Sequence, residues 1–267
     1  LATARFCSTS AVWVAGVGSD VLRDLLSKNP RQEKLIRKAL RYLYSGPRCL
    51  VTASRGLANV LIDELGVHAE NVEVIGNPID LAGLPSPGAR GDDLPADFIL
   101  GVGRLTGVKG FDVLIRAVAK MPHPVPLILL GEGEERAQLE QLGREVGCDL
   151  RMPGFSNDPY RYMRAARAVV VSSRLEGFSN VTLEAMACGT PVVVTDCPHG
   201  PREIVSEGKD GILIPRDDAE KLAQALSQLL EQPEMAAHFA QRGLRRAQDF
   251  DTPTIARRYF ELFDRLS

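Results

Sequence analysis

From about Asp97 onward, the sequence alternates between short runs of apolar residues and longer amphipathic stretches. The apolar runs read FILGVG, PLILLG, LRMPG, AVVVSS, PVVVT and GILIP, and a stretch with helical spacing follows each of them. Six strand-then-helix units in a row predict a parallel, doubly wound α/β sheet. Because the strands are apolar throughout, helices should cover both faces of this sheet. Ligands of such sheets bind at the carboxyl ends of the strands.

The first 80 residues show a weaker version of the same pattern. It predicts a basic helix from Arg31 to Tyr44, a strand from Cys49 to Thr52, a helix from Gly56 to Leu65 and a strand from Val72 to Ile75. These elements amount to half of a second sheet. The stretch from 78 to 95 holds four prolines and three glycines, which break helices and central strands, so we expect an interdomain linker over 81–96.

The end of the chain predicts a separate terminal helix. Asp251 or Thr252 can cap a helix running from Thr254 to Leu266. Asp249 and Asp251 also form a D-x-D triplet, a pattern that can bind Mg²⁺ or Mn²⁺ on a nucleotide. Their place just before a helix favours the capping interpretation.

Composition excludes several classes of protein. With 32 basic and 34 acidic residues, the 267-residue chain has no general positive field for nucleic acid. Its five cysteines form no CxxC pair, which argues against a zinc site or a disulfide framework and indicates a reducing, cytoplasmic compartment. No apolar run approaches the roughly 18 residues of a membrane span.

The segment from Ser172 to Thr195 reads as strand end, loop, helix and strand. Ser179 is suited to cap a helix over Asn180 to Cys188, because Gly189 then ends it. The free N–H groups of that helix would face the carboxyl edge of the sheet, where they favour an anion such as phosphate.

Glu176 in this loop and Glu184 in this helix lie eight positions apart and can face one crevice. Carboxylates accept hydrogen bonds from vicinal hydroxyls, so one could hold a ribose and the other a sugar ring. The alternative is that both are ordinary solvated glutamates.

A glycine-rich loop, GVGRLTGVKG over 101–110, follows the first strand of the larger sheet. Arg104 and Lys109 in it could neutralise a diphosphate without a metal, although both could also be exposed loop cations. Gly101, Gly103 and Gly107 only partly match the dinucleotide fingerprint, so nicotinamide or flavin binding is a minor alternative. His199, in the later turn DCPHGPREIV, has no partner evident in sequence, and we interpret it as structural.

Four motifs, VGRL with Lys109 and Gly110, EGFSNVTLE, AMACGTPVV and VEVIGNPID, together resemble family 4 of the retaining glycosyltransferases. The resemblance covers about Arg37 to Ser267. It implies the GT-B fold, in which two Rossmann-like domains face each other. Residues 97–249 would bind the nucleotide-sugar donor, 1–80 would form part of the acceptor-side domain, and 250–267 would cross back to it.

The resemblance also implies roles for individual residues. Arg104 and Lys109 would bind the donor diphosphate, Glu176 the transferred sugar and Glu184 the ribose. The resemblance places the remaining donor-binding contacts at Gly103, Phe178, Ser179, Asn180 and Val181. It puts Gly154 and Phe155 near the base. No metal or cofactor is expected, because cations and a helix end would stabilise the departing diphosphate.

The chain departs from the family at its amino-terminal end. It begins at Leu1 rather than Met, and about half of the family's first domain is not recognisable, so we expect an amino-terminally truncated chain that lacks full catalytic competence. A basic amphipathic stretch, Arg31 to Arg48, would lie on anionic membrane at the inner face of the cell membrane. The alternative is a solvated helix face.

The predicted function is thus transfer of a sugar, with retention, from a UDP-sugar to a glycan or lipid-linked acceptor in envelope polysaccharide or glycolipid synthesis. One alternative is a donor-binding fragment without turnover. Another is a different GT-B enzyme, such as a nucleotide-sugar epimerase.

Overall fold

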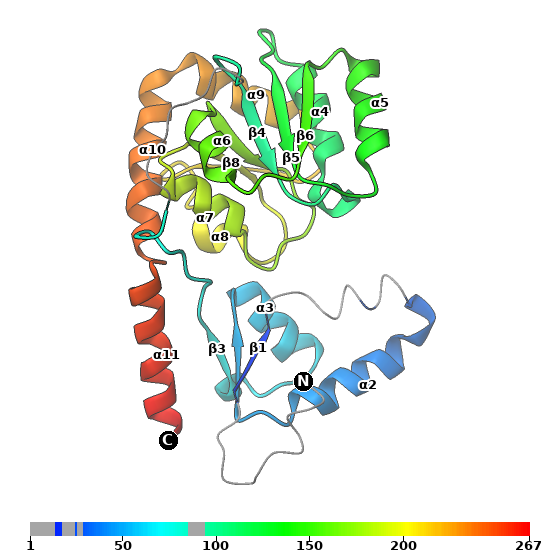
Figure 1. The fold of residues 1–267 in the computed structure, drawn as a ribbon. Helices are drawn as coiled ribbons and strands as arrows, with labels where there is room; N and C mark the ends of the chain where they lie inside the picture. The colour runs from blue at the N-terminus through cyan, green and yellow to red at the C-terminus, as the bar shows by residue number, and fades with distance from the viewer. Residues whose placement is uncertain (1–13, 18–24, 26–28, 85–93) are drawn as a thin grey trace.

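The carboxyl-terminal two thirds of the chain build a sheet of six parallel strands in the order β6-β5-β4-β7-β8-β9 (Figure 1). The computed structural model describes residues 14–17, 25, 29–84 and 94–267. The strands are β4 (Ile99–Val102), β5 (Leu127–Leu130), β6 (Leu150–Gly154), β7 (Ala168–Val171), β8 (Val192–Thr195) and β9 (Ile212–Ile214). The order reverses between β4 and β7, so the crevice expected of a doubly wound sheet opens beside these two strands.

Helices cover both faces of this sheet, as the apolar strands predicted. They are α4 (Phe111–Ala119), α5 (Arg136–Val146), α6 (Pro159–Ala165), α7 (Asn180–Ala187), α8 (Pro201–Ile204), α9 (Ala219–Glu231) and α10 (Pro233–Gln248). Successive residues of one strand point to opposite faces: Val169 belongs to the core under α6 and α7, and Val170 to the core under α4 and α9. The predicted α/β fold with a doubly wound parallel sheet is confirmed.

The smaller sheet has three parallel strands, β1 (Val14–Val17), β2 (Cys49–Thr52) and β3 (Val72–Val74). The prediction missed β1, whose four residues include a glycine and give too short an apolar signal. The helical elements of the smaller domain are the 3₁₀ turn η2 (Pro30–Gln32), α2 (Glu33–Tyr44), α3 (Arg55–Asn59), the π-helical turn η3 (Val60–Glu64) and the 3₁₀ turn η4 (Ala69–Asn71). The basic helix therefore begins two residues later than predicted, because a 3₁₀ turn starting at Pro30 precedes it.

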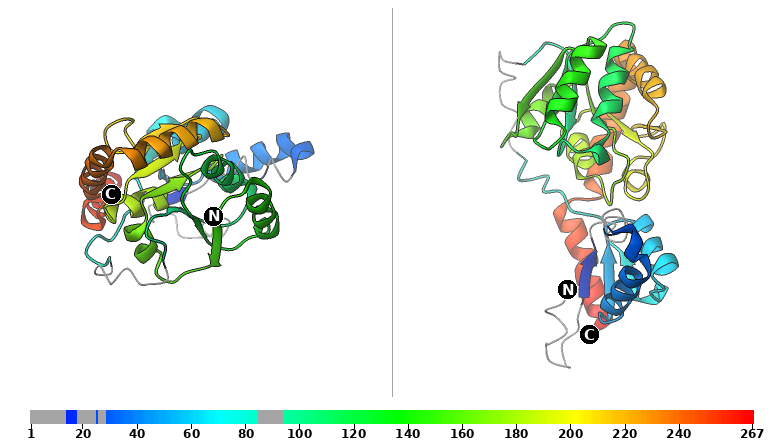
Figure 2. Two further views of the ribbon diagram at one scale, coloured as in Figure 1. Left: turned by 90° about the horizontal axis from the view of Figure 1, so that it is seen from above. Right: turned by 90° about the vertical axis from the view of Figure 1, so that its right-hand side faces the viewer.

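The terminal helix α11 (Thr252–Leu266) lies along the smaller sheet (Figures 1 and 2). Arg258 donates a hydrogen bond to the Val74 carbonyl at 2.7 Å, and Arg265 pairs with Glu73 at 2.8 Å. Ile255 and Leu262 of α11 share one core with apolar residues of β2. The helix starts two residues before the predicted Thr254, because a proline is accepted in a first turn.

The D-x-D triplet serves this junction. Asp251 Oδ1 accepts hydrogen bonds from the backbone N–H groups of Thr252 and Leu81, at 2.9 and 3.3 Å. Asp249 pairs with Arg246 at 2.7 Å. Asp251 therefore caps the start of α11, as the capping interpretation expected, and Asp249 pairs with the last turn of α10.

The two sheets meet along a seam of direct contacts. Ser54 Oγ donates to the Gly177 carbonyl at 2.8 Å, and the Arg55 N–H donates to Glu203 Oε1 at 2.6 Å. Gly76 packs against two aromatic rings, where an added Cβ would lie 2.8 Å from Phe250. This seam places the loops that follow β7 and β8 against the start of α3.

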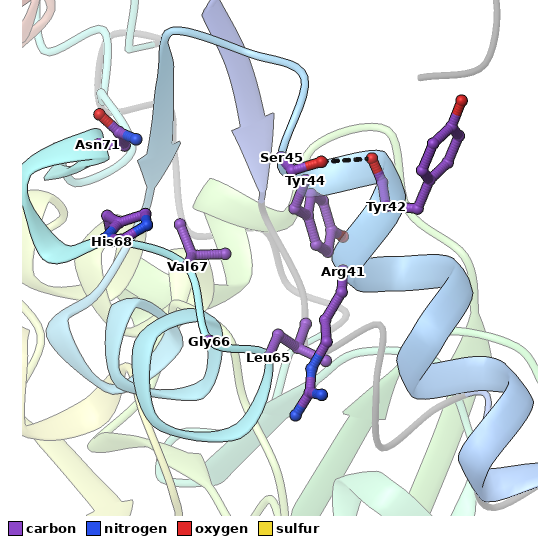
Figure 3. Close-up of a pocket in the computed structure, with 9 residues that line it drawn as sticks. All are labelled: Arg41, Tyr42, Tyr44, Ser45, Leu65, Gly66, Val67, His68 and Asn71. Carbon is purple, nitrogen blue, oxygen red and sulfur yellow. Dashed lines mark hydrogen bonds between the residues drawn. The ribbon is translucent and has the colours of Figure 1, made fainter.

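A cavity of about 600 Å³ lies within the smaller domain, away from this seam (Figure 3). It opens between the end of α2, which carries Arg41, and the loop before β3, which carries His68. The Ser45 hydroxyl beside it donates to the Tyr42 carbonyl at 2.9 Å.

No helix in the described part of the chain is long and apolar enough to cross a membrane.

Candidate functional site

The carboxyl ends of β4 and β5 bring two glycine loops into contact. Gly131, directly after β5, has φ 138°, and a Cβ there would lie only 1.9 Å from the Gly103 carbonyl oxygen. Only glycine allows the two backbones to approach this closely. The loops therefore leave an open space above the strand ends instead of filling it with side chains.

That space is a cavity of about 370 Å³. The predicted residues Gly103, Arg104 and Phe155 line it, and the Phe155 ring is 77% exposed. Sequence reasoning missed the other polar lining residues, Glu132 and Ser156. The Glu132 carboxylate pairs with Arg136 at 3.0 Å.

The second half of the glycine-rich loop forms the 3₁₀ turn η5 (Gly107–Lys109), which aims Lys109 at the loop after β7. Lys109 Nζ lies 2.6 Å from Glu176 Oε1, and the Ser173 hydroxyl donates to the same oxygen at 2.6 Å. The Lys109 and Glu176 side chains are 26% and 11% exposed. The structure thus joins Lys109 and Glu176, two residues of the predicted donor site, in one partly buried ion pair.

Glu184 lies in the second turn of α7 and is half-buried. Burial raises the pKa of its carboxyl group above the ordinary value. Burial also raises the pKa of Tyr160 on α6, and the negative charge of Glu184 adds to that rise. Within the described residues, no hydrogen bond or ion pair to this carboxylate is found. A desolvated carboxylate without a protein partner is suited to accept hydrogen bonds from a ligand.

The start of α7 matches the predicted helix over 180–188 closely, with Ser179 at the N-cap and Cys188 at the C-cap. The Ser179 hydroxyl bonds the Thr182 hydroxyl at 2.7 Å instead of a backbone N–H. Asn180 accepts a hydrogen bond from the Asn77 amide at 2.9 Å across the seam. The first N–H groups of α7 therefore have no side-chain cap.

The side chains of two predicted donor-binding residues, Phe178 and Val181, pack into the core. The Phe178 ring is buried against Phe250, with ring centroids 5.7 Å apart, and the half-buried Val181 packs on the same core. Their side chains therefore pack α7 against the core.

His199 lies at the seam, where its backbone bridges to Glu176. Its φ of 81° is unusual for a residue other than glycine. A Cβ on Gly56 would lie 2.6 Å from His199 Nδ1, so the ring packs closely on the start of α3.

The described residues contain no group of three His, Cys, Asp or Glu side chains suited to hold a metal ion.

These features define an α/β protein of two parallel-sheet domains, with a lysine–glutamate pair and an uncapped helix N-terminus at the carboxyl edge of the larger sheet. Residues 89–246 match the family model described as "Glycosyl transferases group 1". The chain belongs to this family, as the sequence motifs indicated.

Two bacterial proteins are among the curated relatives of this chain. The chain is 32% identical over 217 residues to a Campylobacter jejuni enzyme named N-acetylgalactosamine-N,N'-diacetylbacillosaminyl-diphospho-undecaprenol 4-alpha-N-acetylgalactosaminyltransferase, covering 80% of this chain and 60% of that protein. It is 35% identical over 199 residues to LpsE, a lipopolysaccharide core biosynthesis glycosyltransferase of Rhizobium meliloti, covering 73% and 57%. The chain thus spans about 60% of the length of these relatives.

Solved structures share the whole architecture. Anabaena HepE, in complex with UDP and glucose, superposes with a TM-score of 0.83 at 26% identity and covers 94% of this chain and 71% of HepE. Sucrose-phosphate synthase of Thermosynechococcus elongatus gives a TM-score of 0.85 at 26% identity, covering 99% and 70%. The fold is therefore the GT-B fold of these glycosyltransferases.

Proposed function

We propose that this chain carries the donor site of a retaining glycosyltransferase that uses a UDP-sugar and builds envelope polysaccharide or glycolipid on a glycan or lipid-linked acceptor. The observation that carries the proposal is the Lys109–Glu176 pair at 2.6 Å, which couples the glycine-rich loop to the loop before α7. The family match and the UDP complex of HepE support a nucleotide-sugar donor. The names of the curated relatives support the acceptor class.

The donor diphosphate would lie between the glycine-rich loop and the start of α7. Lys109 and Arg104 supply positive charge there, and the uncapped N–H groups of α7 supply hydrogen-bond donors. As the bond between sugar and diphosphate breaks, negative charge grows on the diphosphate. Fixed cations and amides stabilise that charge without rearrangement, so they lower the barrier. This scheme needs no metal and no cofactor.

The two glutamates would hold the sugars of the donor. When phosphate oxygens engage Lys109, Glu176 is released from its ion pair and can accept a hydrogen bond from the transferred sugar. Glu184, which is desolvated and has no partner among the described residues, would accept hydrogen bonds from the ribose hydroxyls. The exposed Phe155 ring beside the cavity would lie near the base.

Replacement of Lys109 by methionine tests this proposal. We expect Lys109→Met to weaken UDP binding by about 10- to 100-fold, because a charge-assisted contact to phosphate is worth roughly 1.5–3 kcal/mol. Lys120→Met is the matched control: Lys120 pairs with Glu220 at 2.7 Å, but on the exposed surface. Calorimetric titration with UDP measures both variants, and equal affinities for the two would contradict the proposal.

Product analysis separates the alternatives. Where the chain turns over its donor, the proposal predicts release of UDP with a product glycoside that keeps the donor's anomeric configuration, detected by proton NMR. A free nucleotide sugar with inverted ring stereochemistry would indicate an epimerase. UDP binding without turnover would indicate a donor-binding module.

The exposed face of α2 supports a second part of the proposal, peripheral binding to anionic membrane. Leu35 and Tyr42 are 65% and 63% exposed on this helix, and the exposed cations Lys34, Lys38 and Arg41 flank them. The helix projects from the side of the smaller domain (Figure 1). Apolar side chains bordered by cations are the pattern of helices that lie in a lipid interface.

A further inference from the structure

The loop after β7 contacts the η5 turn at three consecutive backbone carbonyls. Arg174 Nη1 donates to the Gly107 carbonyl at 2.6 Å, and the Arg174 backbone N–H donates to the Val108 carbonyl at 2.7 Å. Ser172 Oγ donates to the Lys109 carbonyl at 2.9 Å. Residues 172–174, the clamp segment, therefore fix the backbone on both sides of the Lys109 side chain.

Gly110, the residue after Lys109, shows how closely the two loops approach each other. Gly110 has φ 61°, and a Cβ there would lie 2.2 Å from the Ser172 carbonyl oxygen. Any other side chain would push the η5 turn away from the clamp segment. The position of Lys109 is thus set by contacts with the loop after β7 as well as by its own strand, β4.

Arg174 is itself held by two carboxylates, one from the first turn of α4 and one from the loop after β9. Its two terminal nitrogens donate to the two oxygens of Asp112 at 2.9 and 2.8 Å, and its Nε donates to Asp217 at 2.6 Å. Asp217 has φ 56°, which is uncommon outside glycine, and Arg216 donates to the Arg174 carbonyl at 3.0 Å. One guanidinium therefore joins the loops after β4, β7 and β9, a task that suits its planar fork of donors.

The clamp segment also positions Glu176. The Ser173 hydroxyl donates to Glu176 Oε1, and the Ser173 carbonyl accepts a hydrogen bond from Thr195 of β8. Both partners of the Lys109–Glu176 pair thus depend on residues 172–174. Arg174 anchors this segment most firmly, because it makes contacts through its side chain and through its backbone.

We infer that Arg174 is a positioning residue for the donor: through the η5 turn it sets where the Lys109 ammonium group meets the diphosphate. The inference rests on the proposed function. Without the guanidinium, the Asp112 and Asp217 carboxylates would lose their shared partner and the turn would lose one of its three anchors. Lys109 would remain, but its charge would no longer be held at one place.

Two measurements on the complete chain test the inference. The first is hydrogen exchange of the backbone amides from 105 to 113 without ligand, and the second is the affinity for UDP. The variant is Arg174→Met, and the control is Arg167→Met at the other end of β7. Arg167 is matched in chemistry, because it donates to the Asp97 carboxylate at 2.9 Å and to the Leu230 carbonyl at 3.3 Å.

Arg174→Met should speed exchange in the turn by about tenfold and weaken UDP binding by about tenfold, whereas Arg167→Met should change neither. Should Arg174→Met fail to fold, Asp217→Asn loosens one anchor of the guanidinium and should show the same two changes more weakly. Unchanged exchange, or faster exchange with unchanged UDP affinity, would overturn the inference. If the unaltered chain binds no UDP, the proposed function is contradicted and the donor role of Arg174 is overturned. The exchange data would then still show whether Arg174 holds the η5 turn.

Discussion

At the scale of single residues, the site depends on charges that the fold brings together from distant positions. Lys109 and Glu176 are 67 positions apart in sequence, yet they meet because β4 and β7 are neighbours in the sheet. Their ion pair shows that each has a defined place before a donor arrives. Glu184 differs, because burial raises the pKa of its carboxyl group and none of the described residues pairs with it.

Glu184 should therefore cost stability in the absence of a ligand. Its raised folded-state pKa means that ionisation opposes folding as the pH rises through and above the ordinary carboxyl range. We expect Glu184→Gln to raise the melting temperature at pH 7 by about 1–3 °C and to weaken UDP binding. The gain in melting temperature should shrink as the pH falls toward 4, where the native carboxyl is protonated.

Glu261→Gln on the exposed surface of α11 provides the control and should leave both quantities unchanged. Scanning calorimetry between pH 4 and 8 measures the effect. A melting temperature that falls in Glu184→Gln at pH 7 would show that Glu184 has a structural partner, contrary to its assigned role.

The sequence allowed prediction of the ligand-facing residues better than of the residues that support them. Lys109 and Glu176 follow apolar strands in recognisable motifs, so their place at the sheet edge could be inferred. Phe178 stands in the same motif, but its ring turns toward Phe250, 72 positions later. Arg174 gave no signal at all, because its partners Asp112, in the first turn of α4, and Asp217, in the loop after β9, are far from it in sequence.

At the scale of elements, local pattern predicted the larger sheet well and the smaller one less well. Fully apolar runs such as Leu127–Leu130 and Val192–Thr195 allow hardly any structure except a buried parallel strand. The predicted helix from Gly56 to Leu65 is a short α-helix that continues as the π turn η3. Helical periodicity in the sequence cannot distinguish an α-helix from a π-helical turn, because that difference depends on packing against the sheet.

The exposed face of α2 yields a prediction about membranes. The chain should sediment with anionic vesicles at low salt and be released at high salt, because screening weakens the attraction. Replacing Lys34 and Lys38 by glutamate should abolish sedimentation, since each cation near the surface contributes about 1 kcal/mol. The same double replacement at Arg242 and Arg245, exposed on α10, is the control. Equal sedimentation of both variants would contradict a role for α2.

At the scale of the whole molecule, α11 and the seam join the two sheets into one structure. The helix leaves the larger domain at Asp251 and runs along the smaller sheet, and Ile79 beside it accepts hydrogen bonds from Thr252 (Figure 2). Ser54 contacts the loop after β7 directly, and Arg55 contacts α8. The smaller domain thus forms one wall beside the residues proposed to hold the donor.

Thermal unfolding with UDP, GDP, ADP and NAD tests the central claim, a donor site for a UDP-sugar, most directly. UDP at 100 times its dissociation constant should stabilise the chain by about 2.7 kcal/mol, a rise of roughly 5–10 °C at this size. The rise should be largest for UDP and lost in both Glu184→Ala and Arg104→Ala. A chain that melts cooperatively at the same temperature with and without UDP, or that responds to NAD alone, would contradict this account.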